Sequence, residues 1–333
     1  MATTAATEAR SDQAESFATL HRSLAENMAK AIQGKDDAID LVILALVAEG
    51  HVLIEDVPGV GKTTLAKALA ASVASPFGRI QFTPDLLPSD VIGVNVWDRT
   101  TNTFDLRPGP VFASILLADE INRASPKTQS ALLEAMAERQ VTVDGTTHQL
   151  TRPFLVLATQ NPTDHEGTYP LPESQLDRFL MRISMGYPNR EAELAILDMH
   201  GEEVDTTRDL EAVLSAAHVN GLVQAARGVR TDPAIAGYLV DLAEASRRHP
   251  GVAVGMSPRA TLALQRVSRA RAATRGRTYV TPDDVKALAQ PVLAHRLRLT
   301  AETAVRGVTA ADILNELLDR VPVPQPRPTD LAG

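Results

Sequence analysis

Residues 51–64, which read HVLIEDVPGVGKTT, constrain the fold of this chain more than any other stretch. The segment opens with apolar residues typical of a buried strand, breaks at a proline and two glycines, and continues with helical composition and spacing. Strand, glycine turn and helix in this order form the setting in which a phosphate-binding loop is expected. The glycines allow a left-handed backbone, the turn amides point inward, and the helix N-terminus adds its positive dipole end.

The candidate nucleotide-binding residues of this loop are Pro58, Gly59, Val60, Gly61, Lys62, Thr63 and Thr64. Lys62 would bring a positive charge to the β- and γ-phosphates, and the Thr63 hydroxyl would bind Mg²⁺. Asp56 stands where the G-x-x-x-x-G-K-[ST] pattern has its first glycine. We expect binding to survive, because the core of the pattern at 59–63 is intact; the alternative is an ordinary surface turn followed by a lysine.

A second signal is the apolar run 115–118, which ends in Asp119 and Glu120. In a chain that also has a phosphate loop, Asp119 would hold Mg²⁺ directly or through water, and Glu120 would act as general base toward the attacking water. Asn161 ends the next apolar run, where an amide can orient a water molecule. Each feature alone is also explained by a strand that ends in polar residues, so the prediction rests on the combination.

Composition limits the remaining possibilities. The 333 residues are enough for two domains, and 44% are hydrophobic but only 4% aromatic, so the core must be mostly aliphatic. The absence of cysteine excludes disulfides, cysteine-bound metals and thiol catalysis. The net charge of −8 argues against a large nucleic-acid surface. Residues 39–48 are too short to span a bilayer and the N-terminus resembles no signal peptide, so we expect a cytoplasmic protein without membrane insertion.

Along the chain, residues 1–16 are predicted to be disordered, and five strand-like runs separated by helices follow up to residue 188. This order predicts an α/β fold with a mostly parallel five-stranded sheet, and ligands bind such sheets at the carboxyl ends of the strands. Two hairpins are expected, at about 91–107 and 140–150. Residues 190–300 are predicted to form helices, and 321–333 a flexible tail.

Three arginine-containing features are ambiguous from sequence. Arg178 lies in a short helix predicted at about 173–179, and Arg259 lies after the Ser257-Pro258 pair that predicts a helix start. A cation in a first helical turn opposes the dipole, which favours an anionic partner, although a solvated arginine is the simpler explanation. A basic stretch contains Arg266, Arg269, Arg271, Arg275 and Arg277. A solvated or subunit-facing helix is favoured there over nucleic-acid binding.

Together these motifs resemble the MoxR family of AAA+ ATPases, within the branch that includes magnesium chelatase and MCM proteins. The segments that carry the resemblance span about residues 17–300 and occur in the expected order; they are HVLIEDVPGVGKTT at 51–64, GPVFASILLADEINRASPKTQSALLEAMAERQVTVDG at 109–145, LATQNP at 157–162, GTYPLPESQLDRF at 167–179, MSPRA at 256–260 and YVTPDDVKALAQPVLAHRL at 279–297.

The resemblance implies a P-loop AAA+ core at 17–188 and an all-helical C-terminal lid domain at 189–310. It implies that Lys62 and Thr63 belong to Walker A, Asp119 and Glu120 to Walker B, and that Asn161 is sensor 1. Arg178 would be an arginine finger acting on a neighbouring subunit, and Arg259 would be sensor 2, in cis or in trans. Gln33 and Gly34 would line the adenine pocket. The hairpins would be the helix-2 insertion and the pre-sensor hairpin, both near a central pore.

The resemblance also implies ATP or ADP with Mg²⁺ as cofactors and a homo-oligomer, most simply a hexameric ring. Such a ring would couple ATP hydrolysis to remodelling or activation of a client protein, together with a von Willebrand factor A-type partner. The alternatives are a nucleic-acid-stimulated motor, a magnesium-chelatase-type subunit and a nucleotide-gated scaffold with negligible turnover. The acidic net charge disfavours the first, and Glu120 disfavours the last.

Overall fold

The computed structural model describes residues 2–161, 167–188, 190–191, 193–194 and 206–324, with side chains described from Glu15 onward. The chain separates into two compact units, one formed by Leu20–Val223 and the other by the residues up to Thr19 together with those from Gln224 onward. The sequence placed this boundary near 188 instead. Residues 206–223 add no strand to the sheet, so no signal in the sequence indicated that they belong to the first unit. They are bonded to it, because the amides of Val213 and Leu214 both donate to the Ser72 carbonyl at 3.0 Å.

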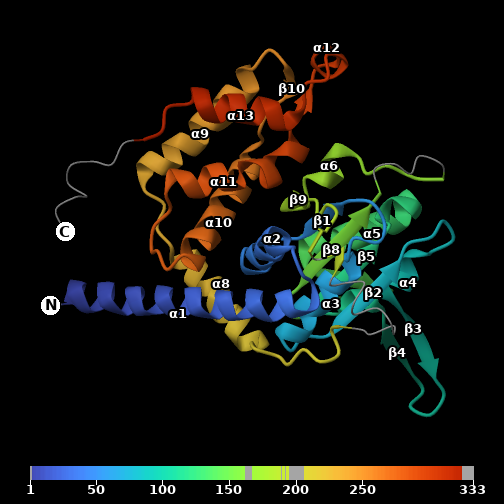
Figure 1. Ribbon diagram of the computed structural model, residues 1–333. Helices are drawn as coiled ribbons and strands as arrows, with labels where there is room; N and C mark the ends of the chain where they lie inside the picture. The colour runs from blue at the N-terminus through green and yellow to red at the C-terminus, as the bar shows by residue number, and fades with distance from the viewer. Residues whose placement is uncertain (1, 162–166, 189, 192, 195–205, 325–333) are drawn as a thin grey trace. The chain divides into compact units, whose positions relative to one another are not determined.

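The first unit is built on a five-stranded sheet, as expected from the sequence, in the order β2-β5-β8-β1-β9 with all neighbours parallel (Figure 1). Its strands are β1 (Val52–Glu55), β2 (Phe77–Gln81), β5 (Ile115–Asp119), β8 (Leu155–Gln160) and β9 (Met181–Ile183). Its helices are the last part of α1 (Ala2–Ala31), α2 (Asp36–Val47), α3 (Lys62–Ser72), α4 (Pro88–Ile92), α5 (Pro126–Glu138), α6 (Glu173–Leu176) and two 3₁₀ turns at Pro110–Phe112 and Ile121–Arg123.

Continuous apolar runs explain the central strands, because a parallel sheet in the middle of an α/β layer is covered on both faces. Leu53, Leu116 and Val156 are fully buried and pack with the α5 residues Leu132 and Leu133 in one cluster. The residues that alternate with them along the same strands are also buried and so face the opposite layer. In Figure 1, α2 and α5 lie on opposite sides of the sheet.

Both hairpins expected from the sequence are present in the first unit. Strands β3 (Gly93–Asp98) and β4 (Thr103–Pro108) pair antiparallel, and so do β6 (Gln140–Val143) and β7 (Thr146–Gln149). The second turn has positive φ at both Asp144 (47°) and Gly145 (82°), which matches the twist of a two-residue hairpin. The first hairpin starts later than predicted, because Val91 belongs to α4.

The structure differs from the sequence prediction at the N-terminus. Residues 2–16, predicted to be disordered, are part of α1, which continues without interruption to Ala31. Low hydrophobicity suggested disorder, but residues 2–31 contain no glycine or proline and are rich in alanine, which favours helix. The first Gly after this segment is Gly34, and α1 ends just before it.

The second unit is mostly helical, in agreement with the predicted helices. Its elements are α8 (Ala216–Gly228), which begins in the first unit, α9 (Pro233–Arg248), α10 (Pro258–Thr274), α11 (Pro282–Leu293), α12 (Ala301–Val305), α13 (Ala310–Arg320), a 3₁₀ turn at Ala294–Arg296 and the short antiparallel pair β10 (Val252–Val254) and β11 (Arg298–Leu299). The sequence did not predict α13 or the β10–β11 pair. Residues 190, 191, 193 and 194 of the helix predicted at 190–200 are described and are helical, whereas the rest of that segment and most of the tail at 321–333 lie outside the described residues.

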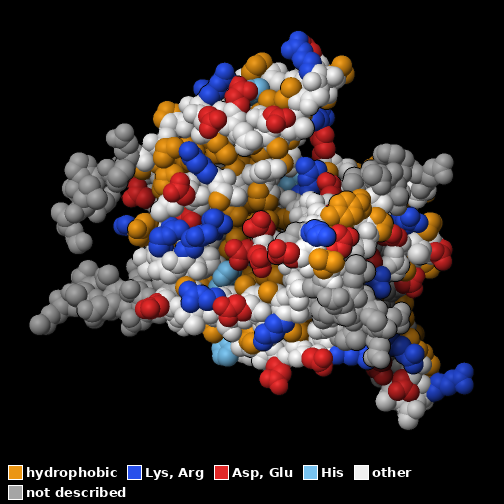
Figure 2. Space-filling model, viewed as in Figure 1, with side chains coloured by type: hydrophobic (Ala, Val, Ile, Leu, Met, Phe, Trp, Pro, Cys, Tyr) orange, Lys and Arg blue, Asp and Glu red, His pale blue; other side chains and the backbone are white. Residues whose placement is uncertain are grey.

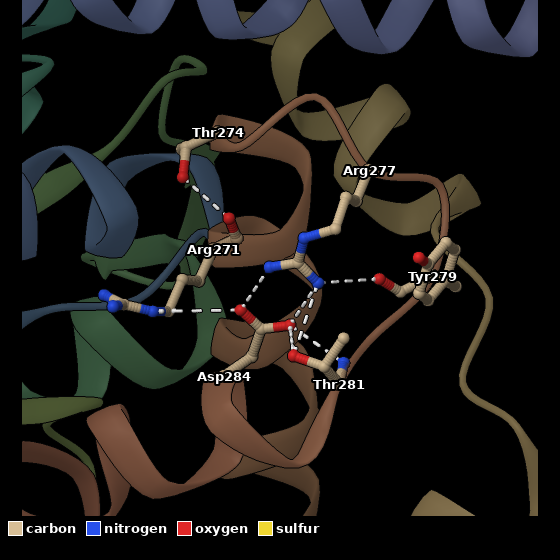
Figure 3. A network of polar contacts seen from close by, with 6 residues as sticks. All are labelled: Arg271, Thr274, Arg277, Tyr279, Thr281 and Asp284. Atoms are coloured by element: carbon tan, nitrogen blue, oxygen red, sulfur yellow. Dashed lines mark hydrogen bonds and ion pairs between the residues drawn. The ribbon is translucent and has the colours of Figure 1, made fainter. Parts of the chain in front are cut away.

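Three arginines of the basic stretch at 266–277 have partners within this unit. Arg277 forms two hydrogen bonds of 2.7 Å with the Asp284 carboxylate, and the Arg271 guanidinium lies 3.8 Å from the same group (Figure 3). The Arg269 guanidinium donates to Thr231 Oγ1 at 3.0 Å. The sequence favoured a solvated or subunit-facing helix, whereas these three arginines are engaged by partners within their own unit.

Charges of both signs are distributed over the surface. On the face shown in Figure 2, the described Lys and Arg side chains alternate with Asp and Glu rather than forming a continuous basic band. None of the helices in the described part of the chain has both the length and the apolar character needed to cross a membrane.

Candidate nucleotide site

One cavity of about 350 Å³ collects the residues that the sequence singled out on separate segments. It lies where the phosphate loop and the carboxyl ends of β5 and β8 meet, the edge at which α/β sheets bind ligands. Its lining residues are Pro58, Gly59, Gly61, Lys62, Thr63, Asp119, Glu120, Thr159 and Asn161.

The phosphate loop has the backbone geometry that its glycines predicted. Gly59 and Gly61 have φ values of 83° and 94°, in the left-handed region that favours glycine. A side chain on Gly61 would also begin 3.2 Å from Ile32 Cδ1. Helix α3 starts directly after this turn, at Lys62. Its first amides therefore have no intrahelical partner and are directed at the cavity edge as an anion-binding end.

The Lys62 side chain is bonded to the start of the phosphate loop. Its ammonium donates to the backbone carbonyl of Asp56 at 2.7 Å, which ties the last residue of the loop to the first. An ammonium has three donors, so this bond leaves two for phosphate oxygens. Burial lowers the pKa of Lys62, and the nearby carboxylates of Asp56, Asp119 and Glu120 oppose that shift. Lys62 is therefore a partly desolvated cation next to the two acidic residues.

The two acidic residues are positioned by β8. The Thr159 hydroxyl donates to Asp119 Oδ1 at 2.7 Å and accepts the Glu120 amide at 2.9 Å. Glu120 has a positive φ of 57°, which turns the chain sharply at the end of β5 and starts the following 3₁₀ helix. A buried threonine on the neighbouring strand thus fixes where both carboxylates leave the sheet.

Side chains of β2 and the 3₁₀ turn hold the same carboxylates. Arg79 forms an ion pair with Asp119 at 2.7 Å. Gln81 donates to Glu120 Oε2 at 2.9 Å, and the Arg123 guanidinium lies 3.2 Å from the same oxygen. Asp119 and Glu120 are therefore restrained but reachable, since these partners sit at the exposed rim of the site.

The sequence-predicted residues divide into those that the cavity brings together and those that it does not. Val60, Thr64, Gln33 and Gly34 are absent from the lining, although Ile32 next to the last two packs against Gly61. Arg178 lies outside the lining too, and donates to the Leu133 carbonyl at 2.6 Å.

Arg259 belongs to the second unit. It is the second residue of α10, where Ser257 caps the helix through the Ala260 amide at 3.1 Å, as the sequence predicted. The predicted helix start is therefore confirmed, whereas the sensor role of Arg259 stays a prediction.

The donor set fits Mg²⁺ held together with a nucleotide. Thr63 supplies a hydroxyl and Asp119 a carboxylate to the same cavity. Mg²⁺ commonly takes one or two protein oxygens and completes its shell with phosphate and water. Within the described residues, no group of three His, Asp or Glu side chains could hold a metal by itself. The site therefore suits a metal that arrives with phosphate rather than a metal enclosed by protein.

Sequence reasoning missed the residues that position the acids: Thr159, Arg79, Gln81 and Arg123. A signal was present for two of them. Arg79 and Gln81 alternate along the short strand β2, so both face the same side, and the register places Gln81 opposite Asp119. That register depends on strand order, which one sequence does not reveal.

Comparison with known proteins agrees with this geometry. Residues 51–181 match the ATPase family associated with various cellular activities (AAA), and residues 244–317 match the AAA lid domain. The uncharacterized protein YeaC of Bacillus subtilis is 49% identical over 302 residues, covering 91% of this chain and 94% of that protein. Chaperone MoxR1 of Mycobacterium tuberculosis is 42% identical over 316 residues, covering 92% and 83%.

Solved structures extend the likeness to the whole fold. A protein of Cytophaga hutchinsonii provisionally assigned as an ATPase has a TM-score of 0.89 at 35% identity and covers 96% of this chain and 99% of its own. An MCM homologue of Methanopyrus kandleri has a TM-score of 0.55 at 20% identity, covering 88% and 62%, and shares the fold alone. The strand order, the phosphate loop, the paired acids and these relatives lead to one conclusion: the chain belongs to the MoxR family of AAA+ ATPases.

Proposed function

We propose that this chain binds ATP with Mg²⁺ in the cavity beside the phosphate loop and hydrolyses the terminal phosphoanhydride bond. The observation that carries the proposal is the convergence in one cavity of Lys62 and Thr63 with Asp119, Glu120 and Asn161. Phosphoryl transfer is catalysed almost entirely by positioning and charge stabilisation, and these are the groups it requires.

Each residue has a role that its place in the cavity supports. The loop amides and Lys62 hold the β- and γ-phosphates, while Thr63 and Asp119 bind the metal. When bound, Mg²⁺ would supply charge neutralisation on the phosphate oxygens. Glu120 accepts the proton of the attacking water on a carboxylate oxygen, and the Asn161 amide orients that water.

The test is replacement of Glu120 by glutamine in the full chain. Glu120→Gln keeps the size and hydrogen-bonding capacity of the side chain but removes the base, so ATP binding is retained and turnover falls by about 100-fold or more. The matched control is Glu134→Gln, an exposed glutamate on α5, which leaves turnover unchanged. Absence of Mg²⁺-dependent hydrolysis by the wild type at every protein concentration rules the proposal out, as does unchanged turnover in Glu120→Gln.

We also propose that the site is completed by a neighbouring subunit in a homo-oligomeric ring, most simply a hexamer. Among the residues that line the cavity, Lys62 is the one cation, whereas an arginine finger raises phosphoryl-transfer rates by orders of magnitude. Arg178 is the candidate, because it lies outside the cavity of its own chain. Arg259, in the second unit, is the candidate sensor 2. Turnover per subunit is expected to rise with protein concentration as the ring assembles.

The proposed outcome of hydrolysis is remodelling or activation of a client protein. This rests on the likeness to a chaperone of the same family and on the two hairpins, which Asn95 and Asp144 join by a 3.0 Å hydrogen bond. Exposed Trp97 and Phe104 on the first hairpin form an edge-to-face pair with centroids 5.0 Å apart, a surface suited to polypeptide contact. Glu120→Gln loaded with ATP should retain the client from a cytoplasmic extract, including any von Willebrand factor A-type partner. As the control, a variant that combines Glu120→Gln with Trp97→Ser and Phe104→Ser should retain no such protein from the same extract.

A further inference from the structure

Asp56 departs from the phosphate-loop pattern, and its surroundings explain what it does there. Asp56 is only 9% exposed, so it is not a surface substitution for glycine. One carboxylate oxygen accepts from the Ser184 hydroxyl at 2.9 Å, the Met185 amide at 2.6 Å and the Gly186 amide at 2.7 Å. The other oxygen accepts the amide of Val57 at 3.0 Å. Asp56 therefore bonds the start of the phosphate loop to the chain that follows β9.

Lys35 binds the opposite side of the same turn. Its ammonium is buried and donates to the carbonyls of Met185 at 2.9 Å and Gly186 at 2.7 Å. The amides of these two residues bind Asp56 and their carbonyls bind Lys35, so all four backbone polar groups of the turn are held by one buried acid and one buried base. Burial alone would raise the pKa of Asp56, but its four hydrogen bonds outweigh burial and hold the pKa below the ordinary value.

The bonded turn also contacts the far end of the phosphate loop. The Met185 methyl group lies 3.8 Å, and the Ile32 methyl group 3.2 Å, from the point where a side chain on Gly61 would begin. Next to Gly61, Lys62 donates from its ammonium group to the carbonyl of Asp56 at the start of the loop. Both ends of the loop thus lie against the same turn.

We propose that Asp56 and Lys35 are positioning residues that hold the phosphate loop in its binding conformation through the turn at Met185 and Gly186. This inference rests on the proposed nucleotide function and deepens it. The hydrogen bonds of the Asp56 side chain order the start of the loop. Asp56 and Lys35 are not proposed to contact the nucleotide. A ligand then binds a loop that is already ordered, and any loss of that order reduces its apparent affinity by the fraction of loops left competent.

Asp56→Gly is the most discriminating variant, because it restores the residue of the common pattern. If the loop needs only the pattern glycine, this variant binds phosphate ligands as well as the wild type or better. If Asp56 orders the loop, affinity for Mg²⁺-pyrophosphate and Mg²⁺-ADP falls by about tenfold or more, corresponding to a competent fraction of roughly one tenth. Ser184→Ala removes one of the four bonds to the carboxylate and gives a smaller loss in the same direction.

Lys35 supplies the second arm of the test. Lys35→Met weakens pyrophosphate binding through the turn, and Lys35→Arg, which can donate to both carbonyls, recovers part of the loss. The double variant Lys35→Met/Asp56→Asn loses less binding free energy for pyrophosphate than Lys35→Met and Asp56→Asn lose together as single variants, because both residues act on one turn.

The measurement is calorimetric titration of the full-length variants with Mg²⁺-pyrophosphate and Mg²⁺-ADP, at a temperature where thermal melts show each to be folded. Gly50→Ala serves as a control that lowers stability elsewhere in the same unit, since its new Cβ would lie 2.2 Å from Leu180 Cδ2; it should melt earlier yet bind normally. Asp56→Gly binding within twofold of wild type overturns the inference, as does an equal loss of affinity in Gly50→Ala. Failure of the wild type to bind either ligand instead refutes the proposed nucleotide function itself.

Discussion

Replacing Asp284 with alanine tests how the second unit is held together. Asp284 has a side chain that is only 2% exposed and receives two hydrogen bonds from Arg277. The Asp284 carboxylate also accepts hydrogen bonds from the amide and the hydroxyl of Thr281, both at 2.9 Å, and these bonds cap α11 (Figure 3). One side chain therefore joins the end of α10, the start of α11 and the segment between them.

The expected loss follows from what the substitution leaves behind. Removing one partner of a buried ion pair usually costs about 3–5 kcal/mol, because the remaining charge is buried without compensation. The Arg277 and Arg271 side chains are 24% and 23% exposed and can partly reach water. We therefore expect a smaller loss, about 2–4 kcal/mol. Amides of α11 that exchange through unfolding should exchange roughly 30 to 900 times faster.

The assay is hydrogen exchange followed by mass spectrometry of peptides from α10 and α11. Asp312→Ala is the matched control, because Asp312 caps α13 through the same bonds to Thr309 but is exposed. The increase in amide exchange caused by Asp312→Ala should be clearly smaller than that caused by Asp284→Ala. Combining Arg277→Met with Asp284→Leu should recover part of the loss, since both charges are then removed. If Asp284→Ala exchanges no faster than Asp312→Ala, the buried network is not what stabilises this unit.

Three further predictions follow from the same geometry. Gly61→Ala requires a left-handed φ of 94° and a Cβ close to Ile32, so Mg²⁺-ADP affinity should fall by at least about tenfold while the melting temperature changes little; normal affinity would contradict the assigned loop geometry. Gly50→Ala crowds Leu180 and should lower the free energy of unfolding by about 1–3 kcal/mol in urea titrations, and an unchanged midpoint would show that the strand shifts freely. Burial would raise the pKa of Asp284, but Arg277 and Thr281 hold it below its ordinary 3.8. Its contribution to stability is therefore complete above that value and lost as the pH falls through the lower folded-state pKa, so Asp284→Asn should show a flatter loss of stability than the wild type in acid melts.

The central elements were predictable because their signals are local. The apolar run before Pro58, the glycines at 59 and 61 and the acids that end β5 each indicate the local structure of their own segment. The structure brings the glycines and the acids into one cavity. The Asp144-Gly145 turn specified its hairpin in the same way.

What the sequence missed depends on strand order or on partners distant in the chain. Gln81 and Thr159 act through neighbours set by the order β2-β5-β8, and nothing in their own segments marks them. Asp56 looked like a defect in a motif because its four donors include residues more than a hundred positions away. Disorder was predicted for 2–16 because hydrophobic content was weighed above the absence of glycine and proline.

The cavity is proposed to be half of an active site that a neighbouring subunit completes, and mixing two inactive variants tests this most directly. Arg178→Ala keeps its own Glu120 but cannot serve its neighbour, whereas Glu120→Gln keeps Arg178 but cannot hydrolyse ATP. Each alone should be inactive in Mg²⁺-ATP hydrolysis. After subunit exchange at equal amounts, half of the subunits carry Glu120 and half of those face an intact Arg178, so activity per subunit should recover to roughly one quarter of wild type. A mixture that binds ATP, assembles and yet stays as inactive as its components would contradict the account.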